Sequence, residues 1–239
     1  MFRHPLKFVL HSALLASLLA NAAAIHLLRA FHAREWLVRR HPIATGPWPT
    51  TGLATAPTVL LLGDSRIRLW PAIESTDLRI VNAGAGGETT AQILLRIDAV
   101  LAETRPKVVV IEAGINDLRT IPLFPNEADA IERTCRENLC HIVDLCRSTG
   151  AAVVLMPIWK TGDIPLWQRP LWNDRAGQAL TRINRSLAAS SPSGASLWLD
   201  TDALLTKADF RDPWHLRRDA YSRLERPLKE AVAHAMASP

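Results

Sequence analysis

The stretch that decides the fold is TVLLLGDSRIRLW, residues 58–70. Its apolar run begins with the β-branched Val59 and is cut off by Gly-Asp-Ser, which indicates a short buried strand, a tight turn and then a helix. In an open parallel sheet, ligands bind outside the carboxyl ends of the strands, so the hydroxyl of Ser65 stands where a nucleophile is needed. Asp64 or Ser65 could equally cap the helix, and the turn by itself leaves both interpretations open.

The chain beyond this stretch alternates apolar runs with longer helical patterns. Further strands are expected at 79–82, 107–113, 151–157 and 196–199, and helices at 90–103, 127–148, 175–189 and 217–237. Runs such as that from Val108 to Ile111 are too apolar for a sheet with one wet face, so helices are expected on both faces. The repeated order of strand and helix predicts an α/β fold with a parallel, doubly wound sheet.

The composition is that of one globular domain. The 239 residues are 48% hydrophobic, which is enough to bury one good-sized core after any targeting segment is set aside. The formal charge is +5, but the arginines are scattered, and we find neither the basic stripe nor a motif of a nucleic-acid-binding protein. Cys135, Cys140 and Cys146 fall in one predicted helix without a Cys-x-x-Cys pair, so the pattern favours neither a disulfide framework nor a metal or redox site.

Residues 1–40 differ in character from the rest. A Leu- and Ala-rich stretch without Asp, Glu, Lys or Arg runs from Phe8 to Leu28, with basic residues on both sides of it. At about 1.5 Å per residue it covers roughly the 30 Å of a bilayer core, which fits a membrane anchor. A signal peptide also fits, because the alanines at 20–24 provide small residues for cleavage, and a buried helix of the domain is a third interpretation. We expect an exported protein, anchored by this segment or released from it.

Residues 41–57 are rich in proline and glycine, which break helices and strands alike. This composition predicts a linker between the N-terminal segment and a domain that spans residues 58–239.

Two other strand ends carry residues that can line the same pocket as Ser65. The loop at 82–90 contains Gly84, Gly86 and Gly87, which let the backbone approach a ligand and expose N–H groups at a helix start. A phosphate-binding loop is the rival interpretation, but the glycine spacing matches neither the dinucleotide pattern nor a phosphate loop. After the strand at 107–113, Asn116 can present its amide to this pocket, although Asn-Asp is also an ordinary turn pair.

The histidine best placed to act as a base is His215, in Asp212-Pro213-Trp214-His215. A carboxylate three residues before a histidine can accept the ring Nδ1–H and leave Nε2 to remove a proton from a serine. The other histidines lie in the N-terminal segment, the linker or the bodies of predicted helices. Taken alone, the pattern also fits an aspartate at a helix start with an unrelated histidine nearby.

Taken in order, these four motifs resemble the SGNH branch of the GDSL esterase and lipase family, and the resemblance covers roughly residues 57–236. It implies a flavodoxin-like three-layer α/β/α sandwich with a five-stranded parallel sheet. The catalytic residues that it implies are Ser65 as nucleophile, His215 as general base and Asp212 as the partner of the base. The implied oxyanion hole consists of the main-chain N–H groups of Ser65 and Gly87 and the side chain of Asn116. Neither a metal nor an organic cofactor is implied.

Three positions depart from the family pattern. Arg66 stands where the family name has leucine, and we expect it at a surface-facing turn position. Leu216 follows His215 where a proline is usual, and this change affects the conformation expected for the loop that carries the base. Glu88 replaces the more usual aspartate of the glycine loop and keeps its charge.

The resemblance implies a serine hydrolase that cleaves a carboxylic ester through an acyl-enzyme, with a lysophospholipid or another lipid ester as substrate. One alternative is an O-acetylesterase or acyltransferase that acts on cell-surface carbohydrate, and another is a membrane-tethered module that binds glycan or lipid without catalysis. Tryptophans at 159, 167, 172 and 214 could line an acyl pocket, stack on sugar rings or simply pack the loops. No nucleic-acid partner is expected.

Overall fold

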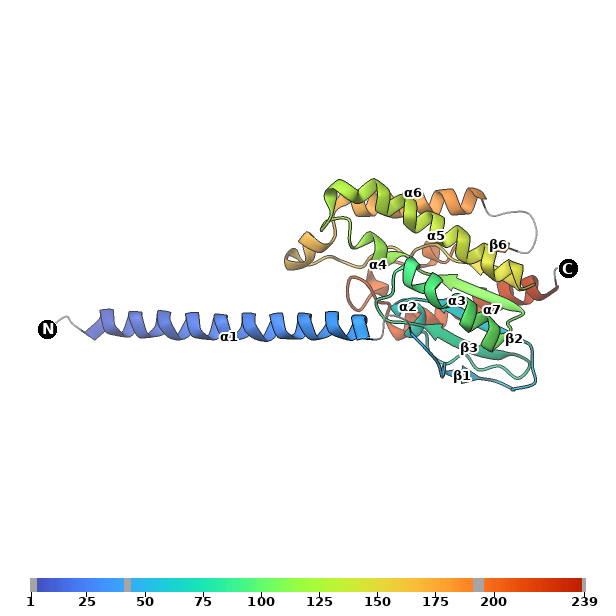
Figure 1. Ribbon diagram of the computed structural model, residues 1–239, viewed down its shortest axis with the longest axis horizontal. Coiled ribbons are helices and arrows are strands. Elements are labelled where there is room, and N and C mark those ends of the chain that lie inside the picture. Colours follow the sequence, from blue (N-terminus) through green and yellow to red (C-terminus); the bar gives the residue numbers. More distant parts are fainter. Residues whose placement is uncertain (1–3, 41–43, 191–195, 238–239) are drawn as a thin grey trace. The chain divides into compact units, whose positions relative to one another are not determined.

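The computed structural model describes residues 4–40, 44–190 and 196–237 (Figure 1). The chain divides into two compact units, Met1–Ala44 and Thr45–Pro239. The strands are β1 (Thr50–Thr51), β2 (Thr58–Gly63), β3 (Arg79–Gly84), β4 (Val108–Glu112), β5 (Ala152–Leu155) and β6 (Ser196–Trp198). The α-helices are α1 (His4–Arg40), α2 (Ser65–Arg68), α3 (Thr90–Thr104), α4 (Ile115–Leu118), α5 (Ala128–Ser148), α6 (Asp174–Ser190) and α7 (Arg218–Ala237). Short 3₁₀ helices are η1 (Pro125–Glu127), η2 (Leu166–Leu171), η3 (Asp202–Leu204) and η4 (Lys207–Asp209).

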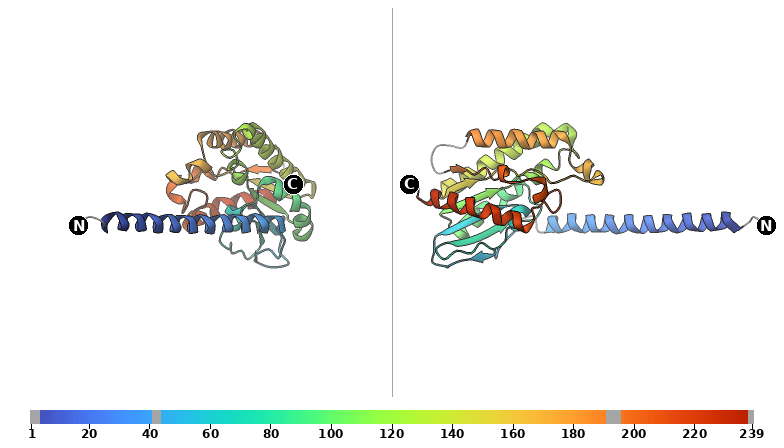
Figure 2. Two further views of the ribbon diagram at one scale, coloured as in Figure 1. Left: turned by 60° about the vertical axis from the view of Figure 1, so that its left-hand side comes forward. Right: turned by 180° about the vertical axis from the view of Figure 1, so that it is seen from behind.

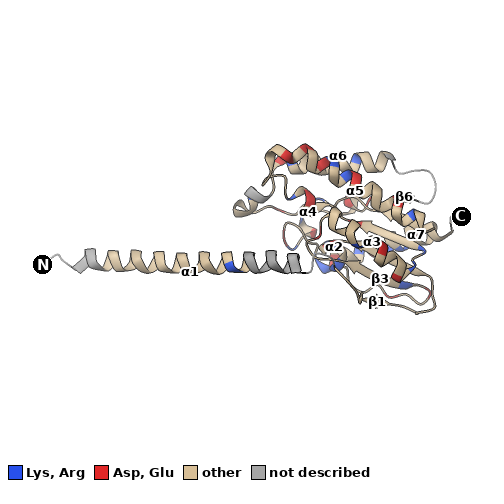
Figure 3. Ribbon diagram, in the orientation of Figure 1, with Lys and Arg blue, Asp and Glu red and all other residues tan. Residues whose placement is uncertain are grey.

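In the N-terminal unit, the structure describes the helix α1. Leucine and alanine favour a helix, and the segment Phe8–Ala30 has a mean hydropathy of 1.8 over 23 residues. Figure 3 shows that the part of this helix coloured by charge carries few charged residues in comparison with α5 and α6. Among the residues that the structure describes, it is the one helix long and apolar enough to cross a membrane.

The second unit is built on a six-stranded sheet in the order β1-β3-β2-β4-β5-β6. The five strands from β2 to β6 pair in parallel, and each lies where an apolar run predicts it, which confirms the predicted α/β class. Because the period of a strand is two, Leu60 and Leu62 point to one face of the sheet, whereas Val59 and Leu61 point to the other. The first face is covered by α3, α5 and α6 and the second by α2 and α7, as the views from the two sides show (Figures 1 and 2).

The sixth strand corrects the expectation of five parallel strands. Thr50 and Thr51 pair in antiparallel register with Val81 and Ile80, so the sheet is mixed. They lie within the stretch predicted as a linker. Residues 41–43 of this stretch fall outside the described ranges, and residues 45–57 belong to the unit that starts at Thr45. The open edge of β3 offers unpaired backbone groups, and even two threonines between Pro49 and Gly52 can satisfy them.

Candidate active site

The nucleophile candidate Ser65 is the first residue of α2, directly after β2. The carboxylate of Asp64 caps this helix by accepting the N–H of Arg66 at 2.9 Å, while Ser65 is half-buried. The capping interpretation therefore holds for Asp64, and the role of Ser65 as nucleophile stays a prediction. Helix α2 lies very close to β3, because a Cβ atom at Gly84 would stand 2.1 Å from the backbone nitrogen of Arg68.

The base candidate His215 lies in a closed turn that directs its ring at Ser65. Its Nε2 is 3.0 Å from the Ser65 Oγ, and its Nδ1 is 2.9 Å from each carboxylate oxygen of Asp212. The same carboxylate accepts the backbone N–H groups of Trp214 and His215, both at 2.9 Å, and Arg211 donates its N–H to the His215 carbonyl. With Leu216 buried at the end of the turn, the hydrogen bonds to Ser65 and Asp212 are intact although the usual proline is missing.

The electrostatics of this pair suit a proton acceptor. Partial burial raises the pKa of Asp212, but the hydrogen bonds from His215 and the Trp214 N–H outweigh it and bring the pKa below its ordinary value. The carboxylate is therefore ionised at neutral pH and favours the tautomer that carries its proton on Nδ1. In this tautomer, Nε2 of His215 has a lone pair directed at the hydroxyl of Ser65.

The oxyanion-hole candidates come from the loops after β3 and β4. Gly87 has a φ of 82°, a backbone conformation that glycine adopts without strain. Asn116, in α4, donates one amide hydrogen to the Glu88 carbonyl at 2.9 Å, which joins it to the residue after Gly87. Since an asparagine amide has two N–H donors, the second can serve a substrate oxygen.

A buried ion pair between Glu88 and Arg96 holds the glycine loop, residues 82–90. Glu88, the departure from the usual aspartate, accepts the Arg96 Nε–H at 2.8 Å, and both side chains are buried. Arg96 also donates to the carbonyls of Ala83 at 2.9 Å and Gly63 at 3.3 Å, at the ends of β3 and β2. Glu88 is thus an acidic residue, like the usual aspartate, and its ion pair with Arg96 fixes the loop.

A second contact ties the glycine loop to α4. The buried carboxylate of Asp117 accepts the Thr90 N–H at 2.9 Å and the Thr90 hydroxyl at 2.6 Å, and the Asn138 amide donates to this hydroxyl at 3.0 Å. Burial raises the pKa of Asp117, and the bonds from Thr90 partly offset this. The first turn of α3 is therefore fixed to the helix that carries Asn116.

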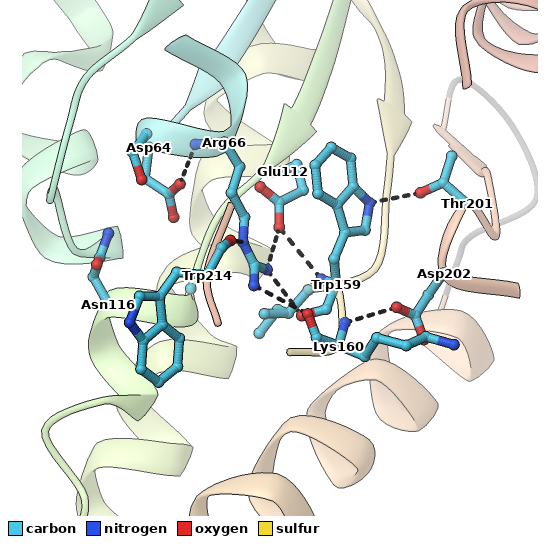
Figure 4. Close-up of polar contacts among 12 residues, drawn as sticks. Asp64, Arg66, Glu112, Asn116, Trp159, Lys160, Thr201, Asp202 and Trp214 are labelled. Atoms are coloured by element: carbon cyan, nitrogen blue, oxygen red, sulfur yellow. Dashed lines mark hydrogen bonds and ion pairs between the residues drawn. The ribbon is translucent and has the colours of Figure 1, made fainter. Parts of the chain in front are cut away.

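Arg66 is the position where the sequence-based expectation is wrong. Expected at a surface-facing turn, its side chain is fully buried and makes a 3.2 Å ion pair with the buried Glu112 of β4 (Figure 4). The reason is that Glu112 ends a strand covered on both faces, where a carboxylate needs a cationic partner. A charged residue at the end of the run Val108–Ile111 is the signal that points to such a partner.

The carboxylates around Arg66 are strongly perturbed. Burial, with the nearby charge of Glu112, raises the pKa of Asp64 well above its ordinary value, although Arg66 opposes the shift. Burial also raises the pKa of Glu112, against the opposing charge and hydrogen bond of Arg66. The charge of Arg66 thus lowers the pKa of both carboxyl groups, but burial outweighs it.

The tryptophans divide between core and loops. Trp159 is fully buried and packs against Trp70 and Tyr221, which fits the packing interpretation. Trp172 and Trp214 meet edge to face with ring centres 5.4 Å apart, close to the loop of His215. In contrast, Trp167 is 74% exposed.

The cysteines take no part in this arrangement. They are free thiols in α5, and burial raises the pKa of each, that of Cys146 to about 12. Within the described ranges, no group of three or more His, Cys, Asp or Glu side chains could hold a metal ion.

The fold and the site define an α/β protein with a serine, a histidine and an aspartate hydrogen-bonded in series at the carboxyl edge of its sheet, the arrangement found in serine hydrolases. A family model for GDSL-like lipases and acylhydrolases matches residues 43–223. The chain belongs to this family, which confirms the resemblance seen in its motifs.

Two of the relatives that the chain matches are named esterases. The chain is 33% identical to esterase TesA of Pseudomonas aeruginosa in an alignment of 155 positions that covers 58% of this chain and 69% of TesA. It is 29% identical to an arylesterase of Vibrio mimicus in an alignment of 116 positions that covers 42% of this chain and 54% of the arylesterase. The crystal structure of a GDSL-like lipase from Bacteroides thetaiotaomicron superposes with a TM-score of 0.61 at 17% identity, over 84% of this chain and 97% of that one, and supports the fold.

Proposed function

We propose that the protein is a serine ester hydrolase that works through an acyl-enzyme. The observation that carries the proposal is the series of hydrogen bonds from Ser65 Oγ to His215 Nε2 at 3.0 Å and from His215 Nδ1 to Asp212 at 2.9 Å. Membership of the GDSL-like lipase and acylhydrolase family, with two esterases among the relatives, supports an ester as the bond that is cleaved.

In the proposed reaction, His215 accepts the proton of Ser65 as the hydroxyl oxygen attacks the ester carbonyl. The negative charge on the carbonyl oxygen is stabilised by the backbone N–H groups of Ser65 and Gly87 and by the amide of Asn116. His215 then gives its proton to the departing alcohol, and the acyl group stays on Ser65. A water molecule, deprotonated by His215, attacks the acyl-enzyme and releases the acid with Ser65 restored.

The proposal extends to a lipid ester, such as a lysophospholipid, as the substrate. Large apolar side chains are exposed on the loop that follows α4 and on η2, namely Leu123, Phe124, Leu166 and Trp167, with exposed fractions of 52–74%. Such side chains suit contact with acyl chains at a membrane surface. The apolar segment 8–30 supports an exported enzyme held at a membrane by its N-terminus.

The experiment that tests the hydrolase uses the full-length protein in detergent, treated with a serine-directed fluorophosphonate and analysed by intact mass. We expect one adduct on the wild type, none on Ser65→Ala, and one on the control Ser222→Ala, whose serine is exposed on α7. Hydrolysis of p-nitrophenyl acetate should fall on the order of 10⁶-fold in Ser65→Ala alone. A folded wild type without adduct or turnover would overturn the proposal.

The substrate class is tested with the same preparations. We compare kcat/KM for a lysophospholipid, a short-chain p-nitrophenyl ester and an acetylated oligosaccharide, in the wild type and in Trp167→Ser. A lipid-ester enzyme should prefer the lysophospholipid and lose part of that preference in Trp167→Ser, with little change on the short ester. Preference for the acetylated oligosaccharide would contradict the lipid assignment while leaving the hydrolase intact.

A further inference from the structure

A buried side chain joins the backbone beside the nucleophile to the backbone beside the base. Arg66 directly follows Ser65 in α2 and is fully buried. Its Nε donates to the carbonyl oxygen of Trp214 at 2.9 Å, and Trp214 directly precedes His215. The two candidate catalytic residues are therefore connected twice, once through Ser65 Oγ and His215 Nε2 and once behind the site through this guanidinium.

The remaining donors of Arg66 fix the guanidinium itself. Its Nη1 donates to the Trp159 carbonyl at 2.8 Å and pairs with Glu112 at 3.2 Å, while Nη2 donates to the Lys160 carbonyl at 3.2 Å (Figure 4). The partners come from β4, from the loop after β5 and from the loop of the base. Only a planar group with several N–H donors in fixed directions can hold these segments at once.

The backbone of Arg66 is held from the other side. The hydroxyl of Tyr221, in α7, donates to the Arg66 carbonyl at 2.7 Å, and Asp64 accepts the Arg66 N–H. Both ends of the residue are thus fixed, so a displacement of Trp214 relative to α2 would break at least one buried hydrogen bond. Leaving a buried carbonyl without a donor is costly, which makes this arrangement stiff.

We propose that Arg66 is a positioning residue that sets the separation of Ser65 Oγ and His215 Nε2. The inference rests on the proposed function of these two residues. Because the side chain of Arg66 is fully buried, it has no access to substrate and acts through the loop of Trp214 and His215. Its loss should therefore slow the attack by Ser65 and lower kcat, with KM little changed.

A purely electrostatic role is the competing explanation, since Arg66 also neutralises Glu112. The two roles are separated by a pair of variants. Glu112→Gln removes the charge of the partner and leaves the three backbone carbonyls bonded to Arg66. Arg66→Met with Glu112→Gln removes the hydrogen bonds to the carbonyls as well, and it leaves no buried carboxylate without its cation at position 112.

The experiment measures the second-order rate of fluorophosphonate labelling of Ser65, together with kcat and KM for p-nitrophenyl acetate, in full-length protein. We expect Glu112→Gln to label at the wild-type rate. The double variant Arg66→Met/Glu112→Gln should label about 10- to 100-fold more slowly, because a displacement of the order of 1 Å in a catalytic group has an effect of this size. Arg66→Lys/Glu112→Gln, with one ammonium in place of the planar group, should fall between them and provides the test if the methionine variant does not fold.

Two outcomes overturn the inference while the hydrolase stands. In the first, a folded double variant is labelled as fast as Glu112→Gln. In the second, Glu112→Gln is itself labelled as slowly as the double variant, which would make the lost charge the cause of the slow labelling. Leu224→Ala, a core substitution in α7, shows whether lost stability alone slows labelling. If the wild type is not labelled at all, the proposed function fails first and the inference falls with it.

Discussion

Arg66 and Arg96 are both buried, and each pairs with a buried glutamate near the carboxyl edge of the sheet, yet they connect different parts of the chain. Arg96 bonds Glu88, eight residues away, and the carbonyls of two neighbouring strand ends. Arg66 bonds Glu112 and three carbonyls that lie 93 to 148 residues further along the chain. The buried arginine on the glycine-loop side thus bonds partners 8 to 33 residues away in sequence, whereas the one on the base side bonds partners 46 to 148 residues away.

The largest effect on stability is expected from breaking the ion pair of Arg96 and Glu88. Arg96→Met leaves the Glu88 carboxylate buried without its cation, which should lower the free energy of unfolding by about 3–5 kcal/mol. Urea unfolding measures this, and Arg96→Met/Glu88→Gln should recover much of the loss. The control Arg182→Met removes an exposed ion pair with Glu132 and should cost less than about 1 kcal/mol. If Arg96→Met and Arg182→Met lowered the free energy of unfolding equally, the buried ion pair would stabilise the protein no more than an exposed one.

The next effect concerns catalysis on the glycine-loop side. Asn116→Ala removes an oxyanion donor and should lower kcat on the order of 10²- to 10³-fold. The matched control is Asn138→Ala, because this asparagine also donates near the loop, to the Thr90 hydroxyl, but is not placed in the oxyanion hole. Steady-state kinetics on p-nitrophenyl acetate separate them, and similar kcat values for the two variants would remove Asn116 from the oxyanion hole.

A smaller effect tests the contact between α3 and α4. Thr90→Val keeps the shape of the side chain but loses the hydroxyl bonds to Asp117 and Asn138, which should cost about 1–3 kcal/mol of stability. Thr181→Val, on the exposed side of α6, is the control. Urea midpoints that shift equally in both variants would show that the contact does not stabilise this side of the site.

The smallest effect is a pH dependence on the base side. Burial and Glu112 raise the pKa of Asp64 well above its ordinary 3.8, with Arg66 in opposition. The folded protein therefore holds this proton more tightly than the unfolded chain, and the resulting stability is full below the unfolded pKa and is lost as pH rises through the folded pKa. Asn at this position can still cap α2 and does not ionise.

It follows that the Tm of Asp64→Asn, measured relative to the wild type, should increase as the pH rises from about 4. Thermal scans between pH 4 and 8 check this, with Asp98→Asn as the control for loss of an exposed carboxylate. A difference in Tm that stays constant with pH would contradict the buried position of Asp64 near Glu112.

The fold could be predicted where local patterns decide it. The run at Val108–Ile111 predicts a strand at 107–113, and β4 spans Val108–Glu112, because burial on both faces leaves little choice of residue type. Strand β1 could not be predicted, since two threonines between Pro49 and Gly52 carry no periodic signal. Its formation depends on the open edge of β3, which is a property of the assembled sheet.

The candidate site divides in the same way. The positions of Ser65 and Asn116 follow from the rule that residues after parallel strands meet at one edge of the sheet. The burial of Arg66 does not follow from its neighbours in sequence, because an arginine after a turn is usually solvated. Its partners are carbonyls of residues 159, 160 and 214, and only the folded chain brings them together. The roles of Ser65, Asp212 and His215 stay predictions that the labelling experiment addresses.

The distance in sequence between Ser65 and His215, 150 residues, has a consequence for biosynthesis. All six strands of the described sheet lie before residue 199, so the strands and the turn of Ser65 are synthesised before the base. A ribosome that stops before residue 215 releases a chain with a nucleophile and no proton acceptor. In the proposed exported enzyme, catalytic competence would thus appear only when the last segment of the chain has been synthesised and folded.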